Sequence, residues 1–151
     1  MDLHTRHAIE HECARLSITY AHAVDFGRYD EFAGLFTEDG VLITTTRTEG
    51  RERIRRRMDA RDPLLRSRHV LTNILVDVID EATARGATYL TLYRHVGPRT
   101  EQPEPIEADA LAAVGHYADE FTRVGDRWYF ASRELEFAFL SPDAFPELRS
   151  R

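Results

Sequence analysis

The spacing of apolar residues changes once along this chain of 151 residues, and that change constrains the fold more than any other feature. In residues 5–26, apolar side chains recur every three or four positions, which is the period of an amphipathic helix. A short helix is predicted within 29–36, and a very polar third helix over 50–61. From residue 67 onward the period becomes two, as in strands with one buried face. Helices followed by a run of strands predict an α+β architecture.

Four long strands follow the helices, and they are predicted over 67–79, 87–96, 108–124 and 127–139, after a short strand at 41–46. We expect a curved antiparallel sheet that wraps around the N-terminal helices and encloses a cone-shaped cavity. Such a cavity is a natural ligand pocket. The length suits a single domain spanning residues 1–151. The proline-rich segment 97–108 is expected to be a solvated loop and not a lid.

Composition excludes several classes of function. The formal net charge of −6 argues against nucleic acid as the main partner. No apolar run is long enough to cross a membrane, and the first residues lack a signal pattern, so we expect a cytoplasmic protein. All 20 basic residues are arginine, which excludes a lysine base or Schiff base. His7 and His11 have a spacing that suits a metal, but no third ligand is evident, so we expect no metal and no organic cofactor.

Polar residues recur on faces that should be apolar. Tyr20 and Asp25 lie near the end of the first helix, and His69 and Asn73 share one face of the strand 67–79. On the next strand His95 shares a face with Tyr93. Buried polar groups cost free energy unless they are paired, so a chain that repeats them is expected to line a cavity with them. A tyrosine, an aspartate and a histidine that converge in an apolar cavity suggest proton transfer.

Two further candidates lie on the last strands. Arg133 is surrounded by apolar residues and needs an anion, which can be a ligand or an acidic side chain such as Asp25. His116 and Tyr117 lie on opposite faces, so only one of them can point inward. Ordinary structural roles also remain open: a core tyrosine for Tyr20, a helix cap for Asp25, a satisfied core histidine for His69 and a surface position for His95.

Three segments resemble a known family: CARLSITYAHAVDFGRYDEFAGLFTEDGVL, RSRHVLTN and GHYADEFTRVGDRWYFASRE. They are similar to the SnoaL-like branch of the nuclear transport factor two-like superfamily, which includes scytalone dehydratase and bile-acid 7α-dehydratase. In those enzymes a His–Asp pair removes a proton. The resemblance implies this role for His69 with Asp25, and a hydrogen-bonding role for Tyr20. It also gives His95 the place of a second strand histidine, so that His95 or Tyr117 is the candidate acid for a departing hydroxyl group.

The resemblance therefore implies a cofactor-independent lyase of the dehydratase type that acts on a hydrophobic small molecule. Four residues are expected to bind that substrate: Arg133, Asn73, Tyr117 and Tyr93. The alternatives are an isomerase or an aldol-type cyclase of a polyketide-like or steroid-like substrate, and a small-ligand-binding domain without catalysis. A homodimer or homotrimer is expected to form through the outer sheet face, with Val70, Ile74, Val76 and Val78 as its apolar residues.

Overall fold

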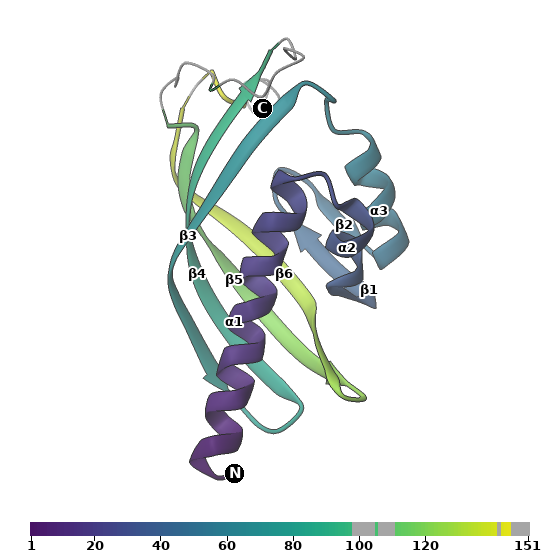
Figure 1. Cartoon of the computed structure of the whole chain (residues 1–151), viewed down its shortest axis with the longest axis vertical. Helices are drawn as coiled ribbons and strands as arrows, with labels where there is room; N and C mark the ends of the chain where they lie inside the picture. The colour runs from purple at the N-terminus through teal and green to yellow at the C-terminus, as the bar shows by residue number, and fades with distance from the viewer. Residues whose placement is uncertain (98–104, 106–110, 142, 146–151) are drawn as a thin grey trace.

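The computed structural model describes residues 1–97, 105, 111–141 and 143–145. Helix α1 (Leu3–Asp25) lies across one face of the sheet. Helices α2 (Tyr29–Gly34) and α3 (Arg51–Asp59) lie beside β1 (Phe36–Ile43) and β2 (Arg47–Glu49), as Figure 1 shows. Most of the segment 97–108, for which a solvated loop was predicted, lies outside the described residues.

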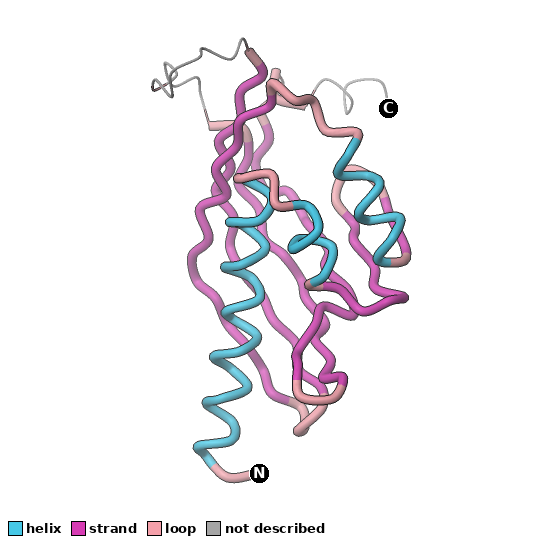
Figure 2. Tube along the Cα trace, turned by 45° about the vertical axis from the view of Figure 1, so that its right-hand side comes forward, coloured by secondary structure: helices cyan, strands magenta, loops and turns pink. Residues whose placement is uncertain are grey.

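Six strands form one open sheet in the order β2-β1-β6-β5-β4-β3. The four long strands are β3 (Leu65–Val78), β4 (Thr83–Val96), β5 (Ala113–Val124) and β6 (Arg127–Leu140). Figure 2 shows these strands bending along their length beside α1. The predicted α+β class and curved sheet are confirmed. The sheet is mixed, however, because β1 pairs with β6 in parallel while the other neighbours are antiparallel.

Both ends of α1 follow the signals in the sequence. Asp2 caps the first turn, where its carboxylate accepts a hydrogen bond of 2.9 Å from the Thr5 backbone N–H. Gly27 follows the last turn with a φ of 70°, which suits a residue without a Cβ. The buried stripe between these ends includes Cys13, Ser17 and Tyr20. The helix therefore presents two polar side chains, Ser17 and Tyr20, to the core.

A β-bulge divides β3 into two halves with opposite phase. Asn73 has a φ of 50°, and the pairing of β3 with β4 shifts between Thr72 and Leu75. One inserted residue inverts the alternation of faces, and asparagine adopts this backbone conformation more readily than most residues. Our expectation that Val76 and Val78 belong to the outer face is therefore wrong, because both pack toward the core. Leu75 takes the outer side instead and is 61% exposed.

The core is dominated by aromatic rings between the helices and the inner face of the sheet. Tyr20 packs against Phe32 with ring centroids 4.6 Å apart and against Tyr117 at 5.5 Å. Phe36 and Phe130 complete the cluster, with their centroids 5.3 Å apart. Such rings supply much of the buried apolar area of a domain.

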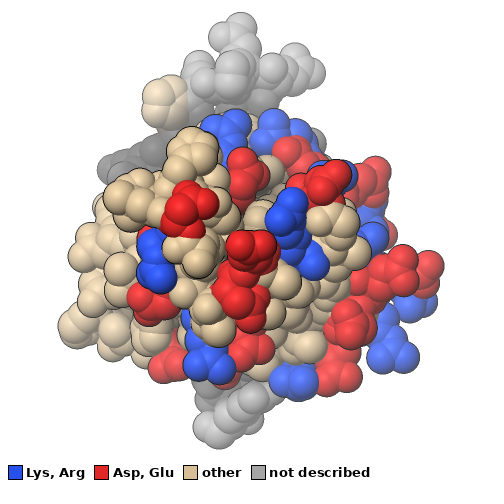
Figure 3. All heavy atoms as spheres, turned by 90° about the horizontal axis from the view of Figure 1, so that it is seen from below, with Lys and Arg blue, Asp and Glu red and all other residues tan. Residues whose placement is uncertain are grey.

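The surface carries charges of both signs. On the face drawn in Figure 3, acidic and basic side chains are interspersed. The whole chain has a formal net charge of −6. No helix within the described residues is long and apolar enough to span a bilayer. The same residues hold no group of three or more His, Cys, Asp or Glu side chains placed to bind a metal ion.

Candidate active site

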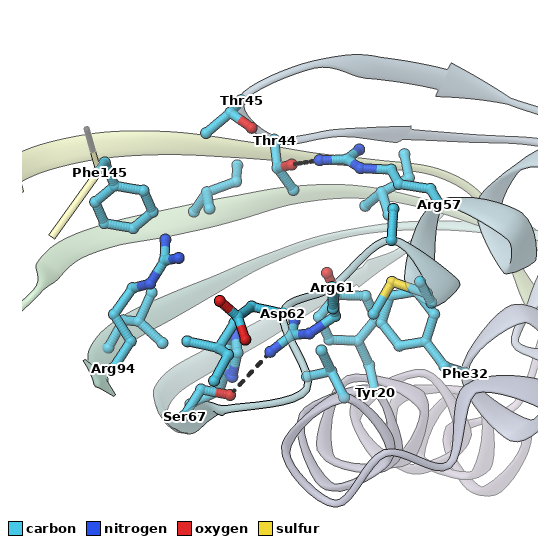
Figure 4. Close-up of a pocket in the computed structure, with 18 of the residues that line it drawn as sticks. Tyr20, Phe32, Thr44, Thr45, Arg57, Arg61, Asp62, Ser67, Arg94 and Phe145 are labelled. Carbon is cyan, nitrogen blue, oxygen red and sulfur yellow. Dashed lines mark hydrogen bonds between the residues drawn. The ribbon is translucent and has the colours of Figure 1, made fainter. Parts of the chain in front are cut away.

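A cavity of about 310 Å³ lies between the end of α1, helix α3 and the inner face of the sheet. This volume is at the lower end of the range for ligand pockets. Its apolar wall includes Val24, Leu42, Met58, Leu92, Leu135 and Phe137. Figure 4 shows several of its polar side chains pointing into the same space. The cavity thus has the mixed lining expected of a site for a small, largely apolar molecule.

Asp25 and His69 form a hydrogen-bonded pair at one wall. The His69 Nδ1 lies 2.6 Å from Asp25 Oδ1, and the His69 backbone N–H donates to Asp25 Oδ2 at 2.7 Å. The Ser67 hydroxyl donates to Asp25 Oδ1 at 2.8 Å. The carboxylate on the last residue of α1 is therefore held by three donors from β3. Only 6% of the Asp25 side chain and 11% of the His69 side chain are exposed.

These contacts keep the carboxylate ionised. Burial by itself raises the pKa of Asp25, but the hydrogen bonds and charge of His69 and the Ser67 hydroxyl outweigh it and lower the pKa below its ordinary value. An ionised carboxylate on Nδ1 fixes the ring orientation and favours the tautomer with its free lone pair on Nε2. His69 lines the cavity, so its unbonded nitrogen can serve as a base there.

Two tyrosines line the floor of the cavity, Tyr20 from α1 and Tyr117 from β5. Their rings pack edge to face, with the centroids 5.5 Å apart. Burial raises the pKa of Tyr20 and raises that of Tyr117 further, so both phenols stay protonated at neutral pH. Tyr117 is therefore the inward residue of the pair His116 and Tyr117. The two phenols can donate hydrogen bonds to an oxygen in the cavity.

Arg133 is an internal residue and not a substrate contact. Its Nε and Nη2 donate to the two carboxylate oxygens of Asp119 at 2.7 and 2.8 Å, and Nη2 also donates to the Ser17 hydroxyl at 2.7 Å. The side chains of Arg133 and Asp119 are both completely buried. The guanidinium carbon lies 4.3 Å from the ring centroid of Tyr20 and 4.2 Å from that of Tyr117. Our expectation that Arg133 binds substrate is wrong, because these groups enclose it; it supports the two tyrosines from behind.

Three other predicted residues do not reach the cavity. Asn73 occupies the bulge and is exposed. On β4 the inner face carries Leu90 and Leu92, so the alternation turns Tyr93 and His95 to the outer face. Tyr93 is 47% exposed. The predicted substrate contacts of Asn73 and Tyr93 and the acid role of His95 are therefore corrected.

The sequence contained signals for three cavity residues that we did not predict. Ser67 precedes His69 by two positions, and a strand places such residues on one face. Arg57 and Arg61 are one helical turn apart and follow the buried Ile54 at helical spacing. They belong to the helix that was predicted over 50–61 as very polar. In the structure both arginines line the cavity.

The sequence matches the family model of the SnoaL-like domain over residues 5–134. A candidate scytalone dehydratase from Novosphingobium aromaticivorans superposes with a TM-score of 0.77 at 22% identity, covering 93% of this chain and 91% of that one. A variant of Rv3472, a Mycobacterium tuberculosis protein of unknown function, gives 0.71 at 25% identity, with coverages of 88% and 78%. A Catenulispora acidiphila protein in complex with S-DNPA gives 0.69 at 23% identity, with coverages of 86% and 93%. No curated protein matches significantly.

Proposed function

Because the chain belongs to the SnoaL-like domain family, we propose that it is a lyase of the dehydratase type that acts on a small, largely apolar molecule. The observation that carries this proposal is the contact of 2.6 Å between His69 Nδ1 and Asp25 Oδ1 at the cavity wall. In this proposal His69 is the base, and Asp25 orients it. Tyr20 and Tyr117 bind the oxygen on which negative charge develops.

The reaction begins at a carbon next to a carbonyl group. His69 Nε2 takes the proton from that carbon, and the electron pair of the C–H bond moves toward the carbonyl oxygen. The ionised Asp25 stabilises the imidazolium that results. A tyrosine hydroxyl donates a hydrogen bond to the developing enolate oxygen, where such a donor acts most strongly. The carbon–oxygen bond of a neighbouring hydroxyl group then breaks, and that group takes the proton and leaves as water.

The second proton transfer is assigned to the cavity residues themselves. Since His95 lies on the outer face of β4, it is not available as the acid for the departing hydroxyl. The His69 imidazolium holds the proton just removed, and returning it to the hydroxyl balances the reaction. Tyr117 also lines the cavity and is a second candidate for this transfer; if it gives its proton to the hydroxyl, the His69 imidazolium returns a proton to the phenolate. Every step of this scheme uses side chains alone.

Two of the similar structures support a small-molecule role. One is a candidate scytalone dehydratase, and another holds the small molecule S-DNPA. An isomerase or an aldol-type cyclase would use the same first step and differ only in the fate of the enolate. A binding domain without catalysis would have no need of a base. The first step is therefore the one to test.

The test is exchange of the acidic protons of 2-tetralone, a bicyclic ketone, in deuterated water, followed by NMR. We expect the wild type to accelerate exchange and His69→Ala to lose about 10²- to 10⁴-fold of that acceleration. His116→Ala is the matched control, because His116 lies on β5 with a 39% exposed side chain and its neighbour Tyr117 faces the cavity instead. Equal exchange by the wild type and His69→Ala would show that His69 is only a wall residue.

A further inference from the structure

We infer that the substrate carries an acidic group of the carboxylate class, which binds between Arg57 and Arg61. This inference rests on the proposed function only in placing the substrate in the cavity beside His69. The two arginines project from the C-terminal end of α3 and its following turn, and both line the cavity. Figure 4 shows Arg57 directed toward Thr44 and Arg61 directed toward Ser67, on either side of the same space.

Arg57 is a partly buried cation that contacts only neutral oxygens. It donates to Thr44 Oγ1 at 2.5 Å, to the Thr46 carbonyl at 3.1 Å and to Thr48 Oγ1 at 3.2 Å. Within the described ranges no carboxylate lies at ion-pair distance from it. Burial lowers the pKa of Arg57, and the positive charge of Arg61 lowers it further. A desolvated cation without a counter-charge is costly, and an anion in the cavity would relieve that cost.

Arg61 is held loosely and lies beside the dyad. Its Nη2 donates to Ser67 Oγ at 3.3 Å, a long hydrogen bond, and Ser67 in turn donates to Asp25. No other side-chain hydrogen bond or ion pair joins Arg61 to the described part of the chain, and its backbone N–H donates to the Met58 carbonyl at 3.2 Å. The guanidinium can therefore turn to an incoming anion without breaking a strong interaction. An anion there would lie at the same end of the cavity as the base.

The charges around the cavity favour an anion over a cation. Three arginines line it, and Arg94, the third, lies with its guanidinium carbon 4.5 Å from the ring centroid of Phe145. Among the described residues, the acidic side chain in the lining belongs to Asp62, an exposed residue whose carboxylate accepts from the Leu64 backbone N–H at 2.8 Å. The described residues that line this cavity therefore include more basic than acidic side chains, although the whole chain has a net charge of −6.

The chemistry of the two arginines indicates the class of anion. Guanidinium groups bind carboxylates through paired, charge-assisted hydrogen bonds. The cavity volume of about 310 Å³ suits a small molecule and not an extended conjugate. An acid group at the arginines would place the apolar remainder of the substrate against Leu92 and Leu135, which share the cavity with His69.

The experiment compares a carboxylate with its neutral isostere. Binding of 2-naphthoate and 2-naphthamide to the wild-type protein is measured by isothermal titration calorimetry. We expect 2-naphthoate to bind about tenfold more tightly or better, as charge-assisted hydrogen bonds predict. Arg61→Gln should remove most of this preference. Arg53→Gln, which removes the same charge from an exposed position of α3, should retain it.

Arg57→Gln is expected to act like Arg61→Gln, but Arg57 also ties α3 to the β1–β2 end of the sheet and its loss can unfold this region. Arg61→Gln loses a single long hydrogen bond, so it keeps the comparison decisive. The same titrations in a His69→Ala background separate the two proposals. A carboxylate preference that survives there supports the anion site whatever the exchange test shows. Equal affinity for the two probes, no binding of 2-naphthoate, or an unchanged preference in Arg61→Gln would overturn the inference.

Discussion

Replacing Asp119 tests how much the charges of the buried Arg133–Asp119 ion pair contribute to the free energy of unfolding. In Asp119→Ala, Arg133 loses both oxygens of its bidentate partner and keeps only the Ser17 hydroxyl. Its Nη1 already has no hydrogen-bond partner among the described residues. The side chain is completely buried, so water cannot replace the carboxylate without opening the core.

The expected loss of stability is large. Breaking a buried pair by removing one partner costs about 3–5 kcal/mol, because the remaining charge is left unpaired in a poorly polarisable interior. For a domain near 150 residues each kcal/mol corresponds to roughly 2–4 °C in Tm. We therefore expect Asp119→Ala to melt about 6–20 °C below the wild type. The stacked rings of Tyr20 and Tyr117 offset part of the cost through cation–π contact.

The assay is thermal unfolding for the Tm and urea unfolding for the free energy, both followed by circular dichroism, with a double variant as the control. Asp119→Leu with Arg133→Met removes both charges and keeps apolar volume, and such replacements are often neutral or stabilising. We expect the double variant to be more stable than Asp119→Ala. With the single variants Asp119→Leu and Arg133→Met, a double-mutant cycle then reports the coupling between the two positions.

Two results would refute this reasoning. If Asp119→Ala unfolds within about 1 kcal/mol of the wild type, Arg133 is not an uncompensated buried charge in the variant. If the double variant is the less stable of the two, the stability comes from the shape of the pair and its packing and not from its charges.

Three further predictions concern single groups and the outer sheet face. The pKa of Asp25 in the folded state lies below its ordinary 3.8, so the ionised Asp25 stabilises the fold above that value, and this contribution is lost as the pH falls below it. Asp25→Asn should therefore weaken the fall of the urea midpoint at acid pH, and an unchanged fall would contradict this prediction. Burial raises the pKa of the Cys13 thiol to about 12, so Ellman's reagent should label the protein only after unfolding, and rapid labelling of the native protein would be inconsistent with that burial. The outer sheet face exposes four large apolar or aromatic side chains by at least 45% each: Val70, Leu75, Tyr89 and Tyr93. We therefore expect a homodimer or larger oligomer that Tyr89→Glu dissociates, and a mass of 17.4 kDa for the wild type in light scattering would rule it out.

Much of the fold was predictable because its elements are long and periodic. The helical stripe of α1 and the alternation of the long strands identified both classes of element. Strand β2 was missed, since three residues are too few to show a period. The phase of β3 was wrong beyond its bulge, because one inserted residue leaves no mark in the hydrophobic pattern. On β4 both faces carry large side chains, so alternation alone could not tell Leu92 from Tyr93 as the inward residue.

Some features of the candidate site were likewise predictable from the sequence, and others required the structure. The sequence showed that Arg133 requires an anion, but choosing Asp119 over Asp25 required the register of β5 against β6, in which Asp119 and Arg133 are direct partners. Register depends on the hairpin and on the bulges at its margins, which a pattern of residue types does not reveal. The cavity positions of Arg57 and Arg61 could not be predicted for another reason. In a helix rich in arginine, the sequence does not show which arginines face solvent and which face the rest of the protein.

Arg133 also joins the last strand to the first helix, through its hydrogen bond to Ser17, and this has a consequence for how the chain acquires its structure. Arg133 and Ser17 are 116 residues apart, and Asp25 and His69 are 44 apart. Contacts so distant in sequence form slowly, because a long loop must close before they stabilise anything. During synthesis α1 emerges first and β6 near the end. The apolar stripe of α1 around Cys13 therefore stays exposed to solvent until the strands that bury it have been made. The cavity is therefore among the last parts of the molecule to form, and its ligand-binding capacity would report on the final stage of folding.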